Sequence, residues 1–318
     1  MKAGAAPSRE PLDVGKASDG PWLVTTEGHP ASAAIFDPGC RNVAKEWGPR
    51  TIFRRSAAVL RSRAVDRLEF SGKLAREAGK LAHTAFGVSA MSMKGRHDVL
   101  TAMDGEVERY IRAAITARYP ADAIIGEEEG GRGAERVWLI DPIDGTANYA
   151  RGIPHYCVSI GYLERNVPTV AAIHDPSHDW LYTAARGEGA TLDGKRLSVS
   201  PCDDLGAATV ECGWSTRRST ADYLALLTRV MNAGCAIRRA GSGALGLVDV
   251  AAGRSEAYCE LHINAWDCAA GILLVQEAGG YTNDFFAGEG LTNGNPVIGT
   301  NRALCAKLAD LIGIPVED

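Results

Sequence analysis

The sequence predicts an α+β or layered α/β fold, and three observations lead to this prediction. Short apolar segments with the length of strands recur along the chain from about residue 64 onward. Segments with the apolar spacing of an amphipathic helix separate some of these strands but not all of them. In the middle of the chain, several strand-like segments follow one another directly. Such mixed runs favour helices layered on mixed sheets over a strict βαβα repeat.

Residues 1–60 differ from the rest of the chain. Proline and glycine are frequent there, and no apolar period persists. We therefore expect a disordered or loosely attached N-terminal extension that does not contribute to the fold. The folded domain is expected at 61–318, with two halves at about 61–200 and 201–318.

The first half begins with two predicted helices. Residues 68–86 place apolar or small side chains on one helical face, and residues 105–119 do the same before Pro120 ends the pattern. Asp193-Gly194 is a typical two-residue hairpin turn within 191–199. The other segments of this half are predicted strands, at 123–125, 137–140, 156–162, 169–173 and 180–184.

The second half repeats the mixture of strands and helices. Glycines just past the expected helix ends, such as Gly234 and Gly253, are typical C-terminal signals. The predicted strands lie at 208–212, 236–239, 257–260 and 296–299. The predicted helices lie at 220–232, 242–252, 267–278 and 302–311.

Composition excludes several classes of protein. The 318 residues are 46% hydrophobic with a net charge of −5, so a nucleic-acid-binding surface is not expected as the main function. No apolar run reaches the roughly 18 residues of a membrane helix, and the start of the chain lacks a signal-peptide core. The eight cysteines form no C-x-x-C pair. A reducing, cytoplasmic location and no membrane partner are expected.

Two histidines, His174 and His178, suggest a possible zinc site. Asp175-Pro-Ser lies between them, however, and strand-like segments lie on both sides. A hairpin turn with solvated polar residues is therefore the preferred interpretation.

Residues 137–148 carry the most functional information. The apolar run 137–140 has the character of a buried strand, and two carboxylates, Asp141 and Asp144, follow it around a proline. Gly145 and Thr146 then open a helix. Carboxylates bind hard cations that share substrate phosphates, and helix N-termini bind phosphate oxygens. The segment therefore suggests metal-assisted phosphoryl chemistry, although an ordinary Asx-type turn remains the alternative.

Three further acids stand at the ends of predicted elements. Asp104 and Asp267 begin helices, and Glu127 follows a strand. Each alone could be a helix cap or a solvated loop residue. Gathered in one cleft with Asp141 and Asp144, however, these charges would repel one another by several kcal/mol unless cations neutralised them. We therefore predict a cluster of Mg²⁺ ions.

These motifs resemble those of the inositol monophosphatase family of Mg²⁺-dependent, Li⁺-sensitive phosphatases. Gly126-Glu127-Glu128, Asp141-Pro-Ile-Asp-Gly-Thr-Ala-Asn148 and Trp266-Asp267-Cys-Ala-Ala-Gly271 are similar to its three signatures, in the same order. The resemblance covers roughly residues 65–315. It implies alternating helix and sheet layers, an αβαβα sandwich of the inositol monophosphatase/fructose-1,6-bisphosphatase type. It also implies a catalytic domain and a homodimer.

The resemblance assigns ligands for two to three Mg²⁺ ions. Glu127, Asp141 and the carbonyl of Ile143 would bind the first ion, and Asp141, Asp144 and Asp267 the second. A third, weaker ion would be held by Glu127 and waters. Two ions can clamp the attacking and leaving oxygens of an in-line displacement.

The resemblance also assigns the residues that activate water. Asp104 and Thr146 would position and deprotonate the attacking water, while the amides of Gly145 and Thr146 hold the phosphate. Lys94 resembles the family's lysine near the third ion; a surface lysine is the alternative.

The implied substrate is inositol 1-phosphate or a similar small polyol phosphate. Ala147-Asn148-Tyr149 resembles the inositol branch of the family rather than its nucleotide phosphatases. Histidinol phosphate is the alternative substrate, and a non-catalytic interaction or regulatory role is the alternative function. The polyol hydroxyls would be bound at Gly241, Ser242, Gly243 and Glu260, with Asp144 and Asp267 also touching the substrate.

Overall fold

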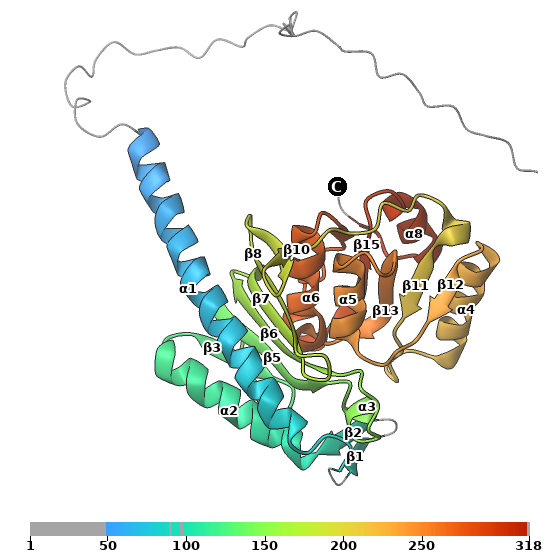
Figure 1. The fold of residues 1–318 in the computed structure, drawn as a ribbon. Coiled ribbons are helices and arrows are strands. Elements are labelled where there is room, and N and C mark those ends of the chain that lie inside the picture. The colour runs from blue at the N-terminus through green and yellow to red at the C-terminus, as the bar shows by residue number, and fades with distance from the viewer. Residues whose placement is uncertain (1–48, 89–90, 96–97, 317–318) are drawn as a thin grey trace, which may run out of the picture. The chain divides into compact units, whose positions relative to one another are not determined.

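The computed structural model describes residues 49–88, 91–95 and 98–316. The larger of its two main sheets has eight strands (Figure 1). The strands are antiparallel except for β3 and β5, which run parallel. In spatial order they are β10 (Lys195–Arg196), β9 (Gly189–Leu192), β8 (Trp180–Ala185), β7 (Val167–Asp175), β6 (Cys157–Glu164), β5 (Arg136–Asp144), β3 (Ala123–Gly126) and β4 (Gly130–Gly131).

A five-stranded mixed sheet forms the second half. Strand β11 runs parallel to β12 and β13, and β15 runs antiparallel to β13 and β14. In spatial order the strands are β12 (Ala236–Arg238), β11 (Thr209–Cys212), β13 (Ala257–Ile263), β15 (Asn295–Thr300) and β14 (Tyr281–Thr282). A separate hairpin consists of β1 (Met91–Gly95) and β2 (Asp98–Thr101).

Helices separate and cover the two sheets. Helices α1 (Pro49–His83) and α2 (Ala102–Arg118) cover the outer face of the large sheet, and α5 (Gly243–Ala251) and α6 (Ala265–Glu277) lie between the sheets (Figure 1). Helices α4 (Thr220–Asn232) and α8 (Cys305–Ile312) cover the far face of the small sheet. The remaining short elements are α3 (Thr146–Tyr149), the 3₁₀ turn η1 (Leu205–Ala207) and α7 (Gly290–Asn293).

Strand β5 shows why the layers form. Its side chains alternate between faces, so Trp138 and Ile140 pack in the cluster under α1 and α2. Val137 and Leu139 pack on the opposite face, in the cluster with α5 and α6. All four side chains are fully buried, since helices cover both faces of the sheet. The predicted αβαβα layering is therefore confirmed.

Helix α1 is longer than predicted. It begins at Pro49 rather than at residue 68, and it ends at His83. Proline is favoured in the first turn of a helix, and neither glycine nor another proline interrupts the chain before Gly72. Most of the extension predicted at 1–60 lies outside the described residues, so that expectation stays a prediction, as do the predicted domain boundaries.

Both predicted hairpins are confirmed, but the expectation of solvated polar residues in the second is wrong for His174 and Asp175, which are 1% and 5% exposed. Asp193 and Gly194 have φ values of 47° and 78° and join β9 to β10, as a type I′ turn requires. The segment with the two histidines joins β7 to β8, and His178 Nδ1 lies 2.7 Å from Asp175 Oδ2 within that turn.

A chain that starts at Ala64 is expected to keep its fold and activity. The described packing of α1 against the large sheet starts at Ala64 and Leu68 and continues through Leu74 and Ala78. We expect a loss below about 1 kcal/mol, which shifts the Tm of a domain this size by roughly 2–4 °C. Thermal unfolding of the full and shortened chains checks this. Insolubility, or a Tm lowered by more than about 10 °C, would contradict it.

Candidate functional site

Two of the predicted acids occupy the same position in their helices, the third residue after the N-cap. Asp104 Oδ2 accepts hydrogen bonds from the backbone N of Thr101 at 2.8 Å and from its hydroxyl at 2.6 Å. Asp267 Oδ2 accepts one from the backbone N of Asn264 at 3.2 Å. Each acid thus completes a capping box. In Asp104, capping uses one carboxylate oxygen and leaves the other to face the site.

The second carboxylate oxygen of Asp104, Oδ1, contacts Thr146. The Thr146 hydroxyl lies 3.1 Å from Asp104 Oδ1 and 2.9 Å from the carbonyl oxygen of Ile143. Asp104 is fully buried, at 0% exposure. The structure therefore brings together the two residues predicted to activate water, from α2 and from the start of α3.

Strand β5 continues through the acidic motif, although the sequence predicted that it would end at Ile140. A bulge between Asp141 and Asp144 shifts the register against β6. Bulges re-aim side chains while a strand continues, so the carboxylates of Asp141 and Asp144 both extend from the C-terminal end of β5. Asp141 is 2% exposed, and its Oδ1 accepts from the backbone N of Ile143 at 3.0 Å.

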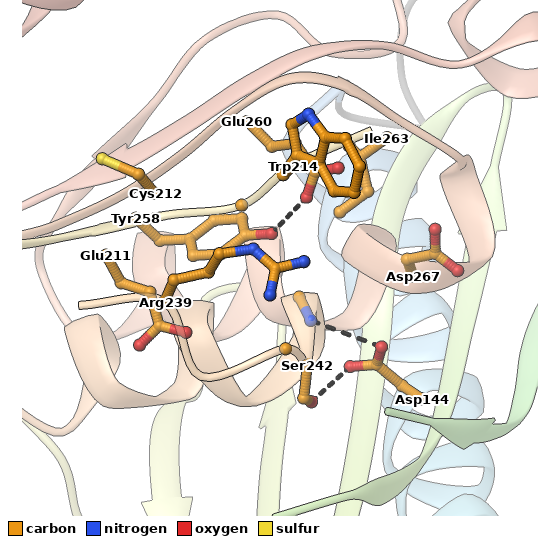
Figure 2. Close-up of a pocket in the computed structure, with 13 residues that line it drawn as sticks. Asp144, Glu211, Cys212, Trp214, Arg239, Ser242, Tyr258, Glu260, Ile263 and Asp267 are labelled. Carbon is orange, nitrogen blue, oxygen red and sulfur yellow. Dashed lines mark hydrogen bonds between the residues drawn. The ribbon is translucent and has the colours of Figure 1, made fainter. Parts of the chain in front are cut away.

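Asp144 joins the two halves of the domain. Its Oδ2 accepts from the Ser242 hydroxyl at 2.5 Å and from the amide of Ala244 at 2.7 Å, and its Oδ1 accepts from the amide of Gly243 at 3.3 Å (Figure 2). These groups form the N-terminus of α5, where a negative charge is stabilised. Ser242 and Gly243, predicted as substrate contacts, thus also hold Asp144 in place.

Loss of hydration and mutual repulsion dominate the electrostatics. Burial, followed by the charges of Glu127, Asp144 and Asp267, raises the pKa of Asp141 well above its usual range. The pKa of Asp267 is raised in the same way by burial and then by Glu127 and Asp144. Burial also raises the pKa of Asp144, although Ser242 and the α5 amides oppose this. Four acids are therefore close enough to disturb one another.

The donor set has the chemistry of a magnesium site. It consists of carboxylate oxygens whose repulsion a hard cation would relieve. Within the described residues, no three acidic, histidine or cysteine side chains are already grouped tightly enough to hold one ion. Asp144 is held in place by the N-terminus of α5. The predicted Lys94 lies in β1, where side chains are outside the described set.

A cavity of about 190 Å³ opens beside these acids (Figure 2). Asp144, Asp267 and Glu260 line it, together with Gly241, Ser242 and Gly243. Its further lining residues include Glu211, Trp214, Arg239 and Tyr258. The sequence interpretation missed these four as site residues. Glu211 lies one residue before the end of the predicted strand 208–212, close to the position that identified Glu127, and the other three residues carry no such signal.

Glu260 is the carboxylate at the far side of the cavity from β5. The Tyr258 hydroxyl donates to Glu260 Oε2 at 2.6 Å. Burial raises the pKa of Glu260 to about 7, against the opposing effects of this hydrogen bond and of Arg239. One carboxylate oxygen of Glu260 is thus engaged by protein.

Two residues of the signature motif build the loop beside the cavity. Asn148 donates its amide to the carbonyl of His155 at 2.8 Å and to that of Ala240 at 2.9 Å. Gly145 has φ 92°, and a Cβ there would lie 3.0 Å from the His155 carbonyl oxygen. Asn148 and Gly145 therefore hold the segment before Gly241 against the end of β5.

Comparisons with known proteins agree with this architecture. The model of the inositol monophosphatase family matches residues 65–313. The chain is 38% identical over 257 residues to "Nus factor SuhB" of Pseudomonas aeruginosa, covering 77% of this chain and 95% of the relative. A solved extragenic suppressor protein suhB from Bartonella henselae has a TM-score of 0.72 at 30% identity, covering 78% and 98% of the chains.

A second solved structure, an IMPase from Thermotoga maritima, has a TM-score of 0.70 at 32% identity and covers 78% of this chain and 97% of its own. The layered sandwich with acids gathered between its two halves agrees with the architecture of these relatives, and the family match supports a phosphatase. The chain belongs to the inositol monophosphatase family. None of the helices in the described part of the chain combines the length and apolarity needed to cross a membrane.

Proposed function

We propose that the chain is a Mg²⁺-dependent phosphomonoesterase that hydrolyses inositol 1-phosphate or a similar small polyol phosphate. One observation carries the proposal. Crowded carboxylates lie beside the Asp104–Thr146 pair, and two of them, Asp144 and Asp267, line a cavity together with a further carboxylate, Glu260. The crowded carboxylates can bind cations, the Asp104–Thr146 pair can activate a water molecule, and Glu260 can accept hydrogen bonds from hydroxyl groups.

The crowded acids would hold two to three Mg²⁺ ions. Glu127, Asp141, Asp144, Asp267 and the carbonyl of Ile143 are the proposed ligands. Bound Mg²⁺ supplies charge neutralisation, a more acidic water and polarisation of the phosphate ester. The Ile143 carbonyl oxygen lies 2.9 Å from the Thr146 hydroxyl, so the proposed ligand and the proposed water-activating residue lie side by side.

Asp104 and Thr146 would move the proton of the attacking water. The Thr146 hydroxyl has one proton, and when it donates this proton to Asp104 Oδ1, its lone pairs can accept a hydrogen bond, and then a proton, from water. Asp104 then acts as the base through this hydroxyl. The amides of Gly145 and Thr146 are proposed to hold phosphate oxygens, and Lys94 to lie near the third ion.

Glu260 is proposed to accept hydrogen bonds from polyol hydroxyls. Glu260→Gln is expected to raise the KM for inositol 1-phosphate about tenfold, because an unmatched buried polar group costs roughly 1–3 kcal/mol. The KM for an aryl phosphate, which offers no such hydroxyls, should change much less. In the wild type, the KM for the polyol ester should also rise below pH about 7, where Glu260 becomes protonated.

Steady-state kinetics of both substrates at pH values from about 1.5 units below to about 1.5 units above the pKa of about 7 for Glu260 measure this. Equal losses for both substrates would make Glu260 a structural residue.

A panel of phosphate esters, assayed with Mg²⁺ and with EDTA, tests the proposal as a whole. We expect inositol 1-phosphate to be hydrolysed with the highest kcat/KM and EDTA to abolish the activity. Activity that survives exhaustive chelation would contradict the metal-dependent mechanism. If kcat/KM is at least tenfold higher for histidinol phosphate, a difference of about 1.4 kcal/mol, then histidinol phosphate replaces the inositol ester as the proposed substrate.

A second candidate is an interaction or regulatory role. Relatives 37–44% identical to this chain carry the name "Nus factor SuhB", and this name favours keeping the candidate. A cytoplasmic homodimer that acts on a small molecule, without a membrane or nucleic acid as its main partner, remains part of the first proposal. A folded protein inactive on every ester of the panel would favour the second candidate.

A further inference from the structure

Glu108 is a buried carboxylate that the proposed mechanism does not use. It lies in α2 four residues after Asp104, and its exposure is 0%. Residues four apart on a helix share one face, so Glu108 lies on the face that carries Asp104. Burying a charge is costly unless it is paired and hydrogen-bonded. The hydrogen-bond partners of Glu108 therefore indicate its role in the structure.

Glu108 binds backbone groups of one turn and one arginine. Its Oε2 accepts from the amide of Glu128 at 2.7 Å, and its Oε1 accepts from the amide of Glu129 at 3.0 Å. Arg112, one turn further along α2, donates its Nε to Glu108 Oε1 at 2.7 Å. The guanidinium of Arg112 also donates to the carbonyl of Gly130. Together the two side chains hold three consecutive residues through charge-assisted hydrogen bonds.

The turn held in this way begins with Glu127. Strand β3 ends at Gly126, and the amide of Glu127 donates to the carbonyl of Ile140 at 3.3 Å, beside Asp141. The carboxylate of Glu108 lies directly against Gly126, because any Cβ there would collide with it. The backbone is thus held by β5 before Glu127 and by Glu108 after it.

We propose that Glu108, supported by Arg112, is a positioning residue for Glu127. The inference rests on the proposed function, in which Glu127 is a Mg²⁺ ligand. Glu108 is not among the residues that line the cavity, and its carboxylate acts through the amides of Glu128 and Glu129. Helix α2 then serves two parts of the site. Its first turn carries Asp104, the proposed water-activating acid, and its second turn carries Glu108, which positions the proposed cation ligand Glu127.

A positioning role has a consequence that a stabilising role lacks. Loss of the Glu108 charge should loosen the turn and weaken cation binding, without changing the KM for substrate once cation is saturating. Residues that orient metal ligands through hydrogen bonds contribute about 10–100-fold in metal affinity. A variant that only loses stability is not expected to show this specific loss of cation affinity.

The test is the affinity of the full-length protein for Mn²⁺, measured without substrate by electron paramagnetic resonance. Glu108→Gln is expected to weaken Mn²⁺ binding at least tenfold. The matched control is Glu256→Gln, which removes another buried carboxylate that accepts a backbone amide, from Thr209 at 2.7 Å, far from Glu127 along the fold. The control is expected to lower the Tm but to bind Mn²⁺ like the wild type.

Unchanged Mn²⁺ affinity in Glu108→Gln, or equal losses in both variants, would overturn the inference. If Glu108→Gln does not fold, Arg112→Lys replaces it, since lysine keeps the charge but loses the Nε–H bond to Glu108. An unchanged affinity in that variant overturns the inference equally. A wild-type protein that binds no Mn²⁺ would refute the metal-dependent function itself and this inference with it.

Discussion

Asp141→Asn is expected to lower kcat/KM by about 10²- to 10³-fold, the loss typical when an electrostatic contributor to the transition state is removed. Asp141 is the proposed ligand shared by two ions, so Mg²⁺ affinity should fall together with the rate. The fold should survive, because an asparagine keeps the oxygen that accepts from the backbone N of Ile143 at 3.0 Å. Mg²⁺ titrations of activity measure both effects.

The same substitution should stabilise the protein when EDTA is present. Burial and three neighbouring acids raise the pKa of Asp141, which means that its charge is unfavourable in the folded state without cations. Removing that charge relieves the repulsion. In EDTA, the Tm of Asp141→Asn should therefore equal or exceed that of the wild type. Sites built for function commonly show this opposition between stability and activity.

Asp122→Asn provides the matched control of opposite sign. The side chain of Asp122 is also nearly inaccessible, at 2% exposure, but Arg67 binds its Oδ2 at 2.7 Å and Arg136 approaches its Oδ1 at 3.2 Å. Loss of its charge should lower the Tm and leave Mg²⁺ affinity unchanged. An Asp141→Asn variant that keeps wild-type kinetics, or that loses stability as Asp122→Asn does, would remove Asp141 from the metal site.

The layered fold could be predicted because its signals are local. Strand β5 is apolar on both faces, and a strand buried on both faces needs helices on each side. The Asp193-Gly194 turn specifies its own hairpin through backbone conformation. The β1–β2 hairpin, β14 and α7 were missed because segments this short carry too little apolar period to be recognised.

The site was predictable only where acids mark the ends of elements. Asp104 and Asp267 could be read as caps or as functional residues, and the structure shows that both act as caps while facing the site. The alternatives were therefore never exclusive, and sequence could not separate them. Tyr258 and Arg239 reach the cavity through the packing of β11–β13, which no local pattern records.

Glu108 shows the opposite limit of sequence reasoning. On a helix, a glutamate four residues before an arginine usually forms an exposed ion pair. Here the pair is turned inward, and the carboxylate accepts amides from a turn that lies 20 residues further along the chain. Only the tertiary structure distinguishes this arrangement from a solvated one.

Asp104→Asn is expected to lower kcat about 10²- to 10⁴-fold, the range for a group that accepts a proton in the transition state. Unlike Asp141, Asp104 is not a proposed ligand, so Mg²⁺ affinity and KM should stay near wild-type values. A loss of about 1 kcal/mol in stability is also expected, because Asp104 caps α2 through Thr101.

The control for loss of a negative charge at this helix position is Asp222→Asn. Asp222 holds the same position in α4, three residues after the N-cap Ser219, but it is exposed to solvent. This variant should lose a similar or smaller amount of stability and no activity. If Asp104→Asn likewise kept its kcat, Asp104 would be a capping residue alone.

Thr146→Val separates a shared catalytic role from two independent ones. The valine keeps the shape of the side chain but loses the hydroxyl that lies 3.1 Å from Asp104 Oδ1. If Asp104 acts on water through that hydroxyl, either substitution breaks the same path. The double variant should then be about as slow as the slower single variant, because residues that act as a unit are not additive. Multiplied losses in the double variant would show that Asp104 reaches the water without Thr146.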